Sequence, residues 1–183
     1  MYELVLTLVS FVFAIAMTHL LTSATELILA RDRVVFSGLQ TLWMVNALIA
    51  LMINWVGFAG FHIQHWTMVD VAFRFVFAIV QYFTCSLLTI RVPEEGVIDM
   101  RAFYRSQRQV IMGAYIAMFL VAMVGNYLYR EASPAWGAQN LVCLVALPAI
   151  ALAAFARPAW MQWAAGLFIL SVGLIFLVLW MPV

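Results

Sequence analysis

The sequence contains no lysine and few charged residues of any kind. Charged side chains account for 9% of its 183 residues and hydrophobic ones for 67%, whereas soluble domains are about one quarter charged and about half apolar. The chain therefore lacks the polar side chains that a water-soluble globular surface needs. A net charge of +1 gives no basic surface for nucleic acid, and the absence of lysine excludes Schiff-base chemistry.

The sequence also lacks the short motifs of enzymes and cofactor sites. It contains no HExxH, GxSxG, P-loop or GxGxxG pattern, the motifs that indicate metal, nucleophile or nucleotide sites. Its two cysteines, Cys85 and Cys143, fall in apolar segments, where lone thiols usually behave as small hydrophobic side chains. The sequence therefore favours a protein that is not an enzyme and holds no cofactor.

Six apolar segments are each long enough to cross a bilayer, which takes a helix of about 20 residues. We expect these helices at residues 4–30, 34–61, 67–90, 109–129, 135–156 and 159–181. The alternating pattern of a barrel strand is absent, and an open sheet is not stable in lipid. The expected fold class is therefore all-α: a polytopic bundle of six transmembrane helices that forms a single domain over residues 1–183.

The placement of arginine predicts how this bundle is oriented. Cytoplasmic loops of membrane proteins are enriched in basic residues. The first, third and fifth expected loops contain Arg31, Arg33, Arg91, Arg101, Arg105, Arg108 and Arg157, whereas the opposite side has Arg130. Both termini are therefore expected on the outer side. Size and composition are typical of a small bacterial protein that is a multi-pass component of the inner (plasma) membrane.

The longest expected cytoplasmic loop, residues 91–108, has some helical organisation of its own. Asp99 is placed to cap a helix that begins at Met100 and continues into the fourth span. Arg101, Arg105 and Arg108 would then share one helical face. They either contact anionic lipid headgroups or a partner protein, or they only hold the loop on the cytoplasmic side, which the positive-inside rule already predicts.

Polar residues within the expected spans are concentrated in the first three helices, within residues 1–90. Because such groups are costly at membrane depth, they are the best candidates for function. Ordered by depth from the outer side, they are Asp70, Arg74, Asn54, Gln81, Asn46, His19 and Glu26. They would form a discontinuous polar ladder across the membrane. The helices of residues 109–183 contain little polarity and are expected to act as an apolar scaffold.

Two pairs in this ladder allow more than one interpretation. His19 and Glu26 share a helical face and could relay a proton, since imidazole titrates near neutrality; alternatively, His19 bonds Asn46 or a backbone carbonyl and only fixes helix packing. Asp70 and Arg74 have the i, i+4 spacing of an ion pair. That pair either neutralises itself or faces an outer vestibule and selects an ion.

Two histidines in the outer loop are weak candidates for a metal site. His62 and His65 are separated by the i, i+3 spacing that metal sites use, and Asp70 is a possible third ligand. The loop has no cysteine and no second acidic cluster. We therefore expect no metal.

Taken as a whole, the sequence predicts a small channel or transporter that passes a proton or small ion along the first three helices. The alternative is a non-catalytic accessory or assembly subunit of a larger membrane complex, in which the same polar residues hold helices together or contact another chain. The expected partners are the lipid bilayer and either further copies of the chain or a partner membrane subunit, and no nucleic acid.

Overall fold

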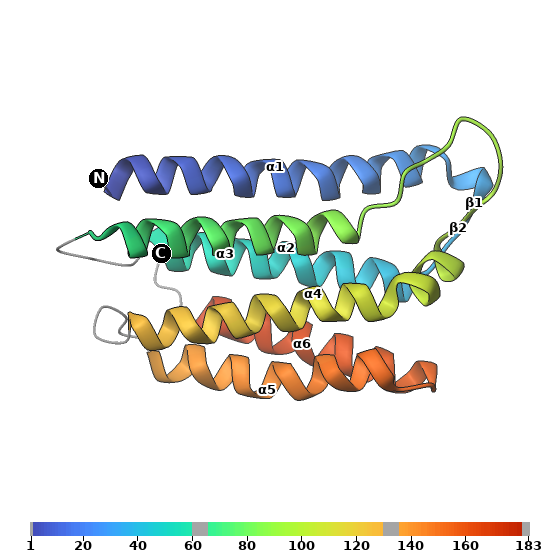
Figure 1. The fold of residues 1–183 in the computed structure, drawn as a ribbon. Coiled ribbons are helices and arrows are strands. Elements are labelled where there is room, and N and C mark those ends of the chain that lie inside the picture. The colour runs from blue at the N-terminus through green and yellow to red at the C-terminus, as the bar shows by residue number, and fades with distance from the viewer. Residues whose placement is uncertain (1, 60–65, 130–135, 181–183) are drawn as a thin grey trace.

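Six long helices dominate the structure, a computed structural model that describes residues 2–59, 66–129 and 136–180. They are α1 (Tyr2–Leu29), α2 (Gly38–Ala59), α3 (Met68–Leu87), α4 (Met100–Leu128), α5 (Trp136–Phe155) and α6 (Ala159–Trp180) (Figure 1). The loops contain a 3-10 turn (Arg31–Arg33) and two strands, β1 (Val34–Val35) and β2 (Ile98–Asp99). Each helix is long and apolar enough to span a membrane. The expected all-α, six-helix architecture is confirmed, and it indicates a multi-pass membrane protein.

The start of α4 follows the expectation from local sequence. Asp99 is the N-cap residue, and its Oδ1 accepts hydrogen bonds from the backbone N–H groups of Arg101 at 2.8 Å and Ala102 at 2.9 Å. A carboxylate at this position satisfies N–H groups that have no partner within the helix. The helix runs without interruption from Met100 to Leu128, so it extends well beyond the apolar segment itself.

The loop before α2 differs from the expectation. The second span was expected to begin at residue 34, but Val34 and Val35 form β1, which pairs in parallel with β2, and α2 begins at Gly38. Arg33 supports this contact, because its Nη1 donates to the carbonyl oxygens of Glu94 at 3.0 Å and Gly96 at 3.3 Å. The first and third loops are therefore joined at one end of the bundle.

The helices form a ring in the order α1, α3, α4, α5, α6 and α2, and each neighbouring pair is in contact. Helix α2 also contacts α3 and α4, so it partly fills the centre of the ring. In Figure 1 the blue helix α1 lies along one edge of the bundle and α5 along the opposite edge. Helices that are adjacent in space are therefore often distant in sequence.

A buried layer of large side chains crosses the bundle near the start of α2. Trp43 and Tyr115 are both 0% exposed, and the hydroxyl of Tyr115 donates to the carbonyl of Trp43 at 2.6 Å. Their rings meet edge to face with centroids 5.1 Å apart, a favoured aromatic geometry. Gly166 lets α6 pack closely here, since a Cβ at this position would lie 2.6 Å from the side chain of Leu42.

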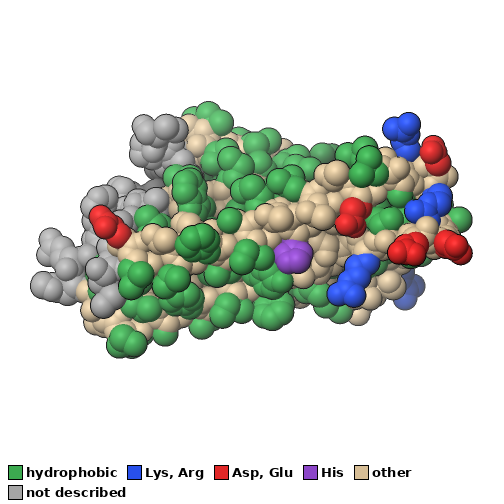
Figure 2. All heavy atoms as spheres, turned by 90° about the horizontal axis from the view of Figure 1, so that it is seen from above, with side chains coloured by type: hydrophobic (Ala, Val, Ile, Leu, Met, Phe, Trp, Pro, Cys, Tyr) green, Lys and Arg blue, Asp and Glu red, His purple; other side chains and the backbone are tan. Residues whose placement is uncertain are grey.

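On the face seen in Figure 2, most charged side chains gather at the end of the bundle that carries β1 and β2, and hydrophobic side chains are spread over the rest. Arginines follow α1 and α3 and lie in the first turns of α4 and before α6. Two of them form hydrogen bonds to backbone carbonyl groups of other segments. Arg101 Nε donates to the carbonyl of Phe36 at 3.1 Å, and Arg108 Nη1 donates to that of Ala156 at 2.9 Å. Arg105 is exposed. At least two of these arginines therefore brace neighbouring loops.

Candidate functional site

A cavity of about 120 Å³ lies between helices α2 to α6, in the half of the bundle away from β1 and β2. Most of its lining is apolar, and the polar side chains that reach it include Asn46, Asn54, Asn126, Tyr129 and Gln139. For comparison, an engineered cavity of about 150 Å³ in another protein accommodates benzene. The cavity therefore has room for a small molecule or several waters.

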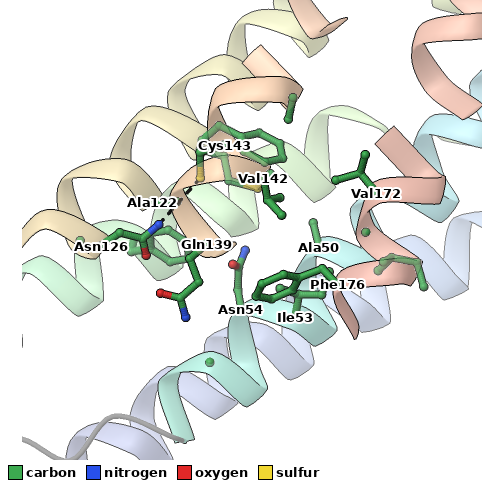
Figure 3. Close-up of a pocket in the computed structure, with 18 of the residues that line it drawn as sticks. Ala50, Ile53, Asn54, Ala122, Asn126, Gln139, Val142, Cys143, Val172 and Phe176 are labelled. Carbon is green, nitrogen blue, oxygen red and sulfur yellow. Dashed lines mark hydrogen bonds between the residues drawn. The ribbon is translucent and has the colours of Figure 1, made fainter. Parts of the chain in front are cut away.

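The amide groups of three helices come together on one side of this cavity (Figure 3). Asn54 is on α2, Asn126 on α4 and Gln139 on α5. Val172 and Phe176 of α6 lie on the other side (Figure 3). A mostly apolar pocket with a few convergent polar groups is the usual composition of a small-molecule site.

Asn46 is the polar residue nearest the Trp43 layer. Its Nδ2 donates to the carbonyl oxygens of Leu42 at 3.1 Å and Gly166 at 3.0 Å. Both partners are backbone carbonyls and can only accept, so they fix the orientation of the amide. The side chain is 3% exposed and joins α2 to α6, and the NH₂ group is the part of the amide that these bonds use.

Asn54 and Gln81 connect α2 to α3. Asn54 Nδ2 donates to Gln81 Oε1 at 2.7 Å, and Gln81 Nε2 approaches Cys85 Sγ at 3.7 Å. Gln81 is fully buried, where an amide without hydrogen bonds would be costly. Both residues were among the candidates expected from the sequence, and the structure brings them together. Only Asn54 of the two reaches the cavity.

Asn126 and Gln139 were not among the expected site residues, because α4 to α6 were expected to be only scaffold. Asn126 Nδ2 points toward Cys143 Sγ at 3.9 Å, and both residues line the cavity. A signal was present in the sequence. Gln139, Val142, Cys143 and Ala146 recur at i, i+3, i+4 and i+7, which places them on one helical face.

Arg74 lies beside the cavity within a group of aromatic rings. Its side chain is 3% exposed, and its Cζ is 4.9 Å from the ring centroid of Phe58, 5.2 Å from that of Trp66 and 5.3 Å from that of Tyr129. These are cation–π distances. Phe58 and Tyr129 also line the cavity, so aromatic rings separate the guanidinium from it.

Asp70 interacts electrostatically with Arg74, as its spacing predicted, and it also makes hydrogen bonds that the spacing does not predict. Its Oδ2 accepts from the backbone N–H of Thr67 at 2.8 Å and from the Thr67 hydroxyl at 2.6 Å, which forms a capping box at the start of α3. Its Oδ1 accepts from the Tyr129 hydroxyl at 2.8 Å. Burial, together with this bond to a carboxylate, raises the pKa of Tyr129, so the phenol remains a neutral donor.

His19 and Glu26 do not lie with the other candidates, so the polar ladder expected from the sequence does not continue through these two residues inside the bundle. Both are exposed on the side of α1, and Figure 2 shows His19, the purple side chain, within a hydrophobic surface midway along the bundle. His19 Nε2 lies 3.4 Å from the hydroxyl of Tyr82. Asn46 binds α6 instead of His19. Helix α1 turns these groups outward, away from the amides of α2 and α3.

The remaining candidates for a metal site, His62 and His65, lie outside the described residues. Within residues 2–59, 66–129 and 136–180, no group of three or more His, Cys, Asp or Glu side chains is placed to hold a metal ion. The cavity is therefore the strongest candidate site in the described part of the chain. No protein-family model, no curated protein and no solved structure matches this chain.

Proposed function

We propose that the chain is a small membrane transport protein and that the cavity between α2 and α6 binds its cargo. One observation carries this proposal: amides from α2, α4 and α5 converge on a mostly apolar cavity inside the bundle. Polar groups at membrane depth are costly and usually mark a pathway or a binding site.

We also propose an orientation and a membrane. The arginines collect at the end of the bundle with β1 and β2, which by the positive-inside rule places this end in the cytoplasm and both termini outside. The cavity then lies in the outer half of a bundle inserted in the plasma membrane of a bacterium. Arg105, which is exposed at the cytoplasmic end, is placed to contact anionic headgroups.

In this orientation, the Trp43 and Tyr115 layer separates the cavity from the cytoplasm. Both side chains are fully buried, as is Met112 beside them. Cargo that binds in the cavity can cross only if the helices around this layer move apart, so the proposal requires a second conformation with the layer open. The structure then corresponds to a state that is closed on the cytoplasmic side.

The sequence predicts a proton or small-ion path along α1 to α3, and this form of the transport proposal stays a hypothesis. Asn54 and Gln81 support it, because they meet between α2 and α3. His19 and Glu26 add no support, since they lie on the outer side of α1. For this reason we place the proposed path through the cavity of α2 to α6.

The accessory-subunit alternative is favoured by one specific observation. His19 is exposed on the side of the bundle among hydrophobic residues (Figure 2), and polar side chains in membrane helices usually face protein or water. A neighbouring membrane helix could cover it. This role and a transport role are compatible, because the two use different surfaces.

Flux measurements in proteoliposomes test the transport proposal. The matched variants are Val172→Phe, which inserts a ring into the cavity wall, and Val178→Phe, the same change at a position that is 77% exposed on α6. Uptake of at least one small solute or ion above that of empty liposomes, lost in Val172→Phe and kept in Val178→Phe, is the expected result. Uptake equal to that of empty liposomes for every solute and ion would reject transport.

A further inference from the structure

We infer that the cavity binds a small uncharged solute that bears N–H or O–H donors on a short carbon frame, the chemistry of a polyol or a primary amide. This inference rests on the proposed function, since it specifies the cargo of the same cavity. It follows from which amide atoms face the cavity, from the charges around it, and from its size.

Three of the cavity amides, Asn46, Asn54 and Asn126, direct their NH₂ groups at partners within the protein. In Asn46 the NH₂ group lies between two backbone carbonyls, Leu42 at 3.1 Å and Gly166 at 3.0 Å. Exchange of its oxygen and nitrogen would place an acceptor against two acceptors, so the orientation is fixed. What Asn46 has left for a ligand is its carbonyl oxygen.

Two further cavity amides, Asn54 on α2 and Asn126 on α4, also direct their NH₂ groups at partners within the protein. Asn54 gives its NH₂ group to Gln81 Oε1 at 2.7 Å, and Asn126 directs its NH₂ group at the sulfur of Cys143 at 3.9 Å. Figure 3 shows the amide ends of Asn54 and Asn126 on the same side of the cavity, beside Gln139. In these bonds the carbonyl oxygens of Asn46, Asn54 and Asn126 are not used, so they are the acceptors through which the cavity can bind a ligand with donors.

The surrounding charges disfavour an ion of either sign. None of the described residues that line the cavity is charged, so a bound ion would lose its hydration without a counter-charge. The guanidinium of Arg74 lies behind Phe58 and Tyr129, and the carboxylate of Asp70 accepts from the same Tyr129. These two charges have opposite sign and offset each other, so they supply no net charge that would hold an ion in the cavity. The acceptor oxygens of the amides oppose an anion. An uncharged donor satisfies both conditions.

The walls and the volume limit the ligand further. Phe73, Phe77 and Phe119 contribute to an apolar lining, which suits the C–H surface of a carbon frame. A cavity of about 120 Å³ is somewhat smaller than the one of about 150 Å³ that binds benzene, so the ligand can be no larger than benzene. Glycerol and acetamide both fit within this limit.

A binding experiment on the full-length protein in nanodiscs tests this inference directly. The probes are glycerol, acetamide, N,N-dimethylacetamide, methylammonium and acetate, and the measurement is saturation-transfer NMR with empty nanodiscs as the background. Dimethylacetamide keeps the acetyl group and the carbonyl of acetamide but has no N–H donor. We expect glycerol and acetamide to bind, dimethylacetamide to bind about ten-fold more weakly or less, and the two ions to give no signal above background.

Two variants separate the cavity from other binding sites. Val172→Phe should abolish the acetamide signal, whereas Val178→Phe on the lipid-facing side of α6 should leave it unchanged. Asn126→Leu should reduce the preference for acetamide over dimethylacetamide, since it removes one acceptor from the cavity. Equal binding of the two amides, or a signal that survives Val172→Phe, would overturn the inference.

Flux of the same solutes distinguishes the two proposals from each other. Proteoliposomes that shrink in a glycerol or acetamide gradient should re-swell faster than empty ones, and Val172→Phe should remove the difference. A proton or sodium flux that is sensitive to Val172→Phe would keep transport and overturn the uncharged cargo. Binding sensitive to Val172→Phe without any flux would keep the ligand class and reject transport.

Discussion

The hydroxyl of Tyr129 donates a 2.8 Å hydrogen bond to Asp70, which joins the end of α4 to the first turn of α3. The same carboxylate caps α3 through Thr67, and the ring of Tyr129 lies 5.3 Å from the guanidinium carbon of Arg74. One tyrosine therefore contacts an acid, a base and the cavity. This relationship connects residues 59 positions apart.

Replacement of Tyr129 by phenylalanine tests this connection. Tyr129→Phe keeps the ring beside Arg74 but removes the donor to Asp70, so it should lower stability by about 1 kcal/mol. Thermal unfolding in detergent, followed by tryptophan fluorescence, measures the change. Asp70→Ala is the comparison, because it removes the acceptor of this bond together with the capping bonds to Thr67, so it should cost more than Tyr129→Phe. A Tyr129→Phe protein as stable as the wild type would show that the bond contributes nothing.

The raised pKa of Tyr129 predicts how its contribution depends on pH. Burial and the bond to Asp70 favour the protonated phenol in the folded protein. Its stabilising effect should therefore be complete below about pH 10, the ordinary pKa of tyrosine, and should fall as the pH rises through the higher folded-state pKa. The measurement is the difference in melting temperature between wild type and Tyr129→Phe at successive pH values. A difference that does not shrink at high pH would contradict the assignment.

Close packing of α6 against α2 gives a second stability prediction. In Gly166→Ala the new methyl would lie 2.6 Å from Leu42, and such overpacking costs about 1–3 kcal/mol. The double variant Gly166→Ala, Leu42→Ala should recover part of the loss, since it removes the side chain that is contacted. Gly113→Ala is the matched control, because a methyl group at this position would meet no neighbouring helix or side chain within 4 Å. Equal effects of Gly166→Ala and Gly113→Ala would argue against this packing.

The Trp43 and Tyr115 layer should control leakage through the bundle if the cavity is part of a transport path. Tyr115→Ala removes a fully buried ring and should raise the basal glycerol permeability of proteoliposomes several-fold. Tyr115→Phe loses only the 2.6 Å bond to the Trp43 carbonyl, so it should keep the glycerol permeability of the wild type while its stability falls by about 1–3 kcal/mol. Unchanged permeability in a folded Tyr115→Ala protein would place the barrier elsewhere.

The exposed position of His19 separates a solitary bundle from a subunit of a complex. In a bundle surrounded only by lipid, His19→Leu should be neutral or stabilising, because it replaces a polar side chain on the lipid-facing surface. If another membrane helix covers this surface, the same variant should weaken cross-linking or co-purification with that partner from native membranes. Chemical cross-linking with and without the substitution gives the comparison. Ala14→Leu, also exposed on α1, is the control.

Local features of the fold could be predicted from the sequence because neighbouring residues determine them. The cap by Asp99 and the start of α4 at Met100 depend on a few consecutive residues, and the six apolar segments depend only on composition. The strand β1 was missed because its partner β2 lies more than 60 residues away. Two valines in an apolar stretch give no local sign of such a pairing.

The candidate site was less predictable, because it depends on which helices are neighbours. The sequence indicates that Asn46 and Asn54 lie at membrane depth, but the order of helices around the ring decides that they meet α4, α5 and α6 instead of α1. His19 shows the opposite outcome, because it was expected inside the bundle and lies on its surface. Its depth and its helical face could be assigned from the sequence, but α1 turned out to lie at the edge of the bundle, with this face outward.

The pairing of β1 with β2 has a mechanical consequence. Together with the bonds from Arg33 to the carbonyls of Glu94 and Gly96, it clamps the α1–α2 connection to the α3–α4 connection. Four helices thereby share a common pivot at the arginine-rich end. If these helices tilt relative to one another, the displacement is smallest at the β1–β2 pairing. It is largest at the opposite helix ends, which lie beside the cavity.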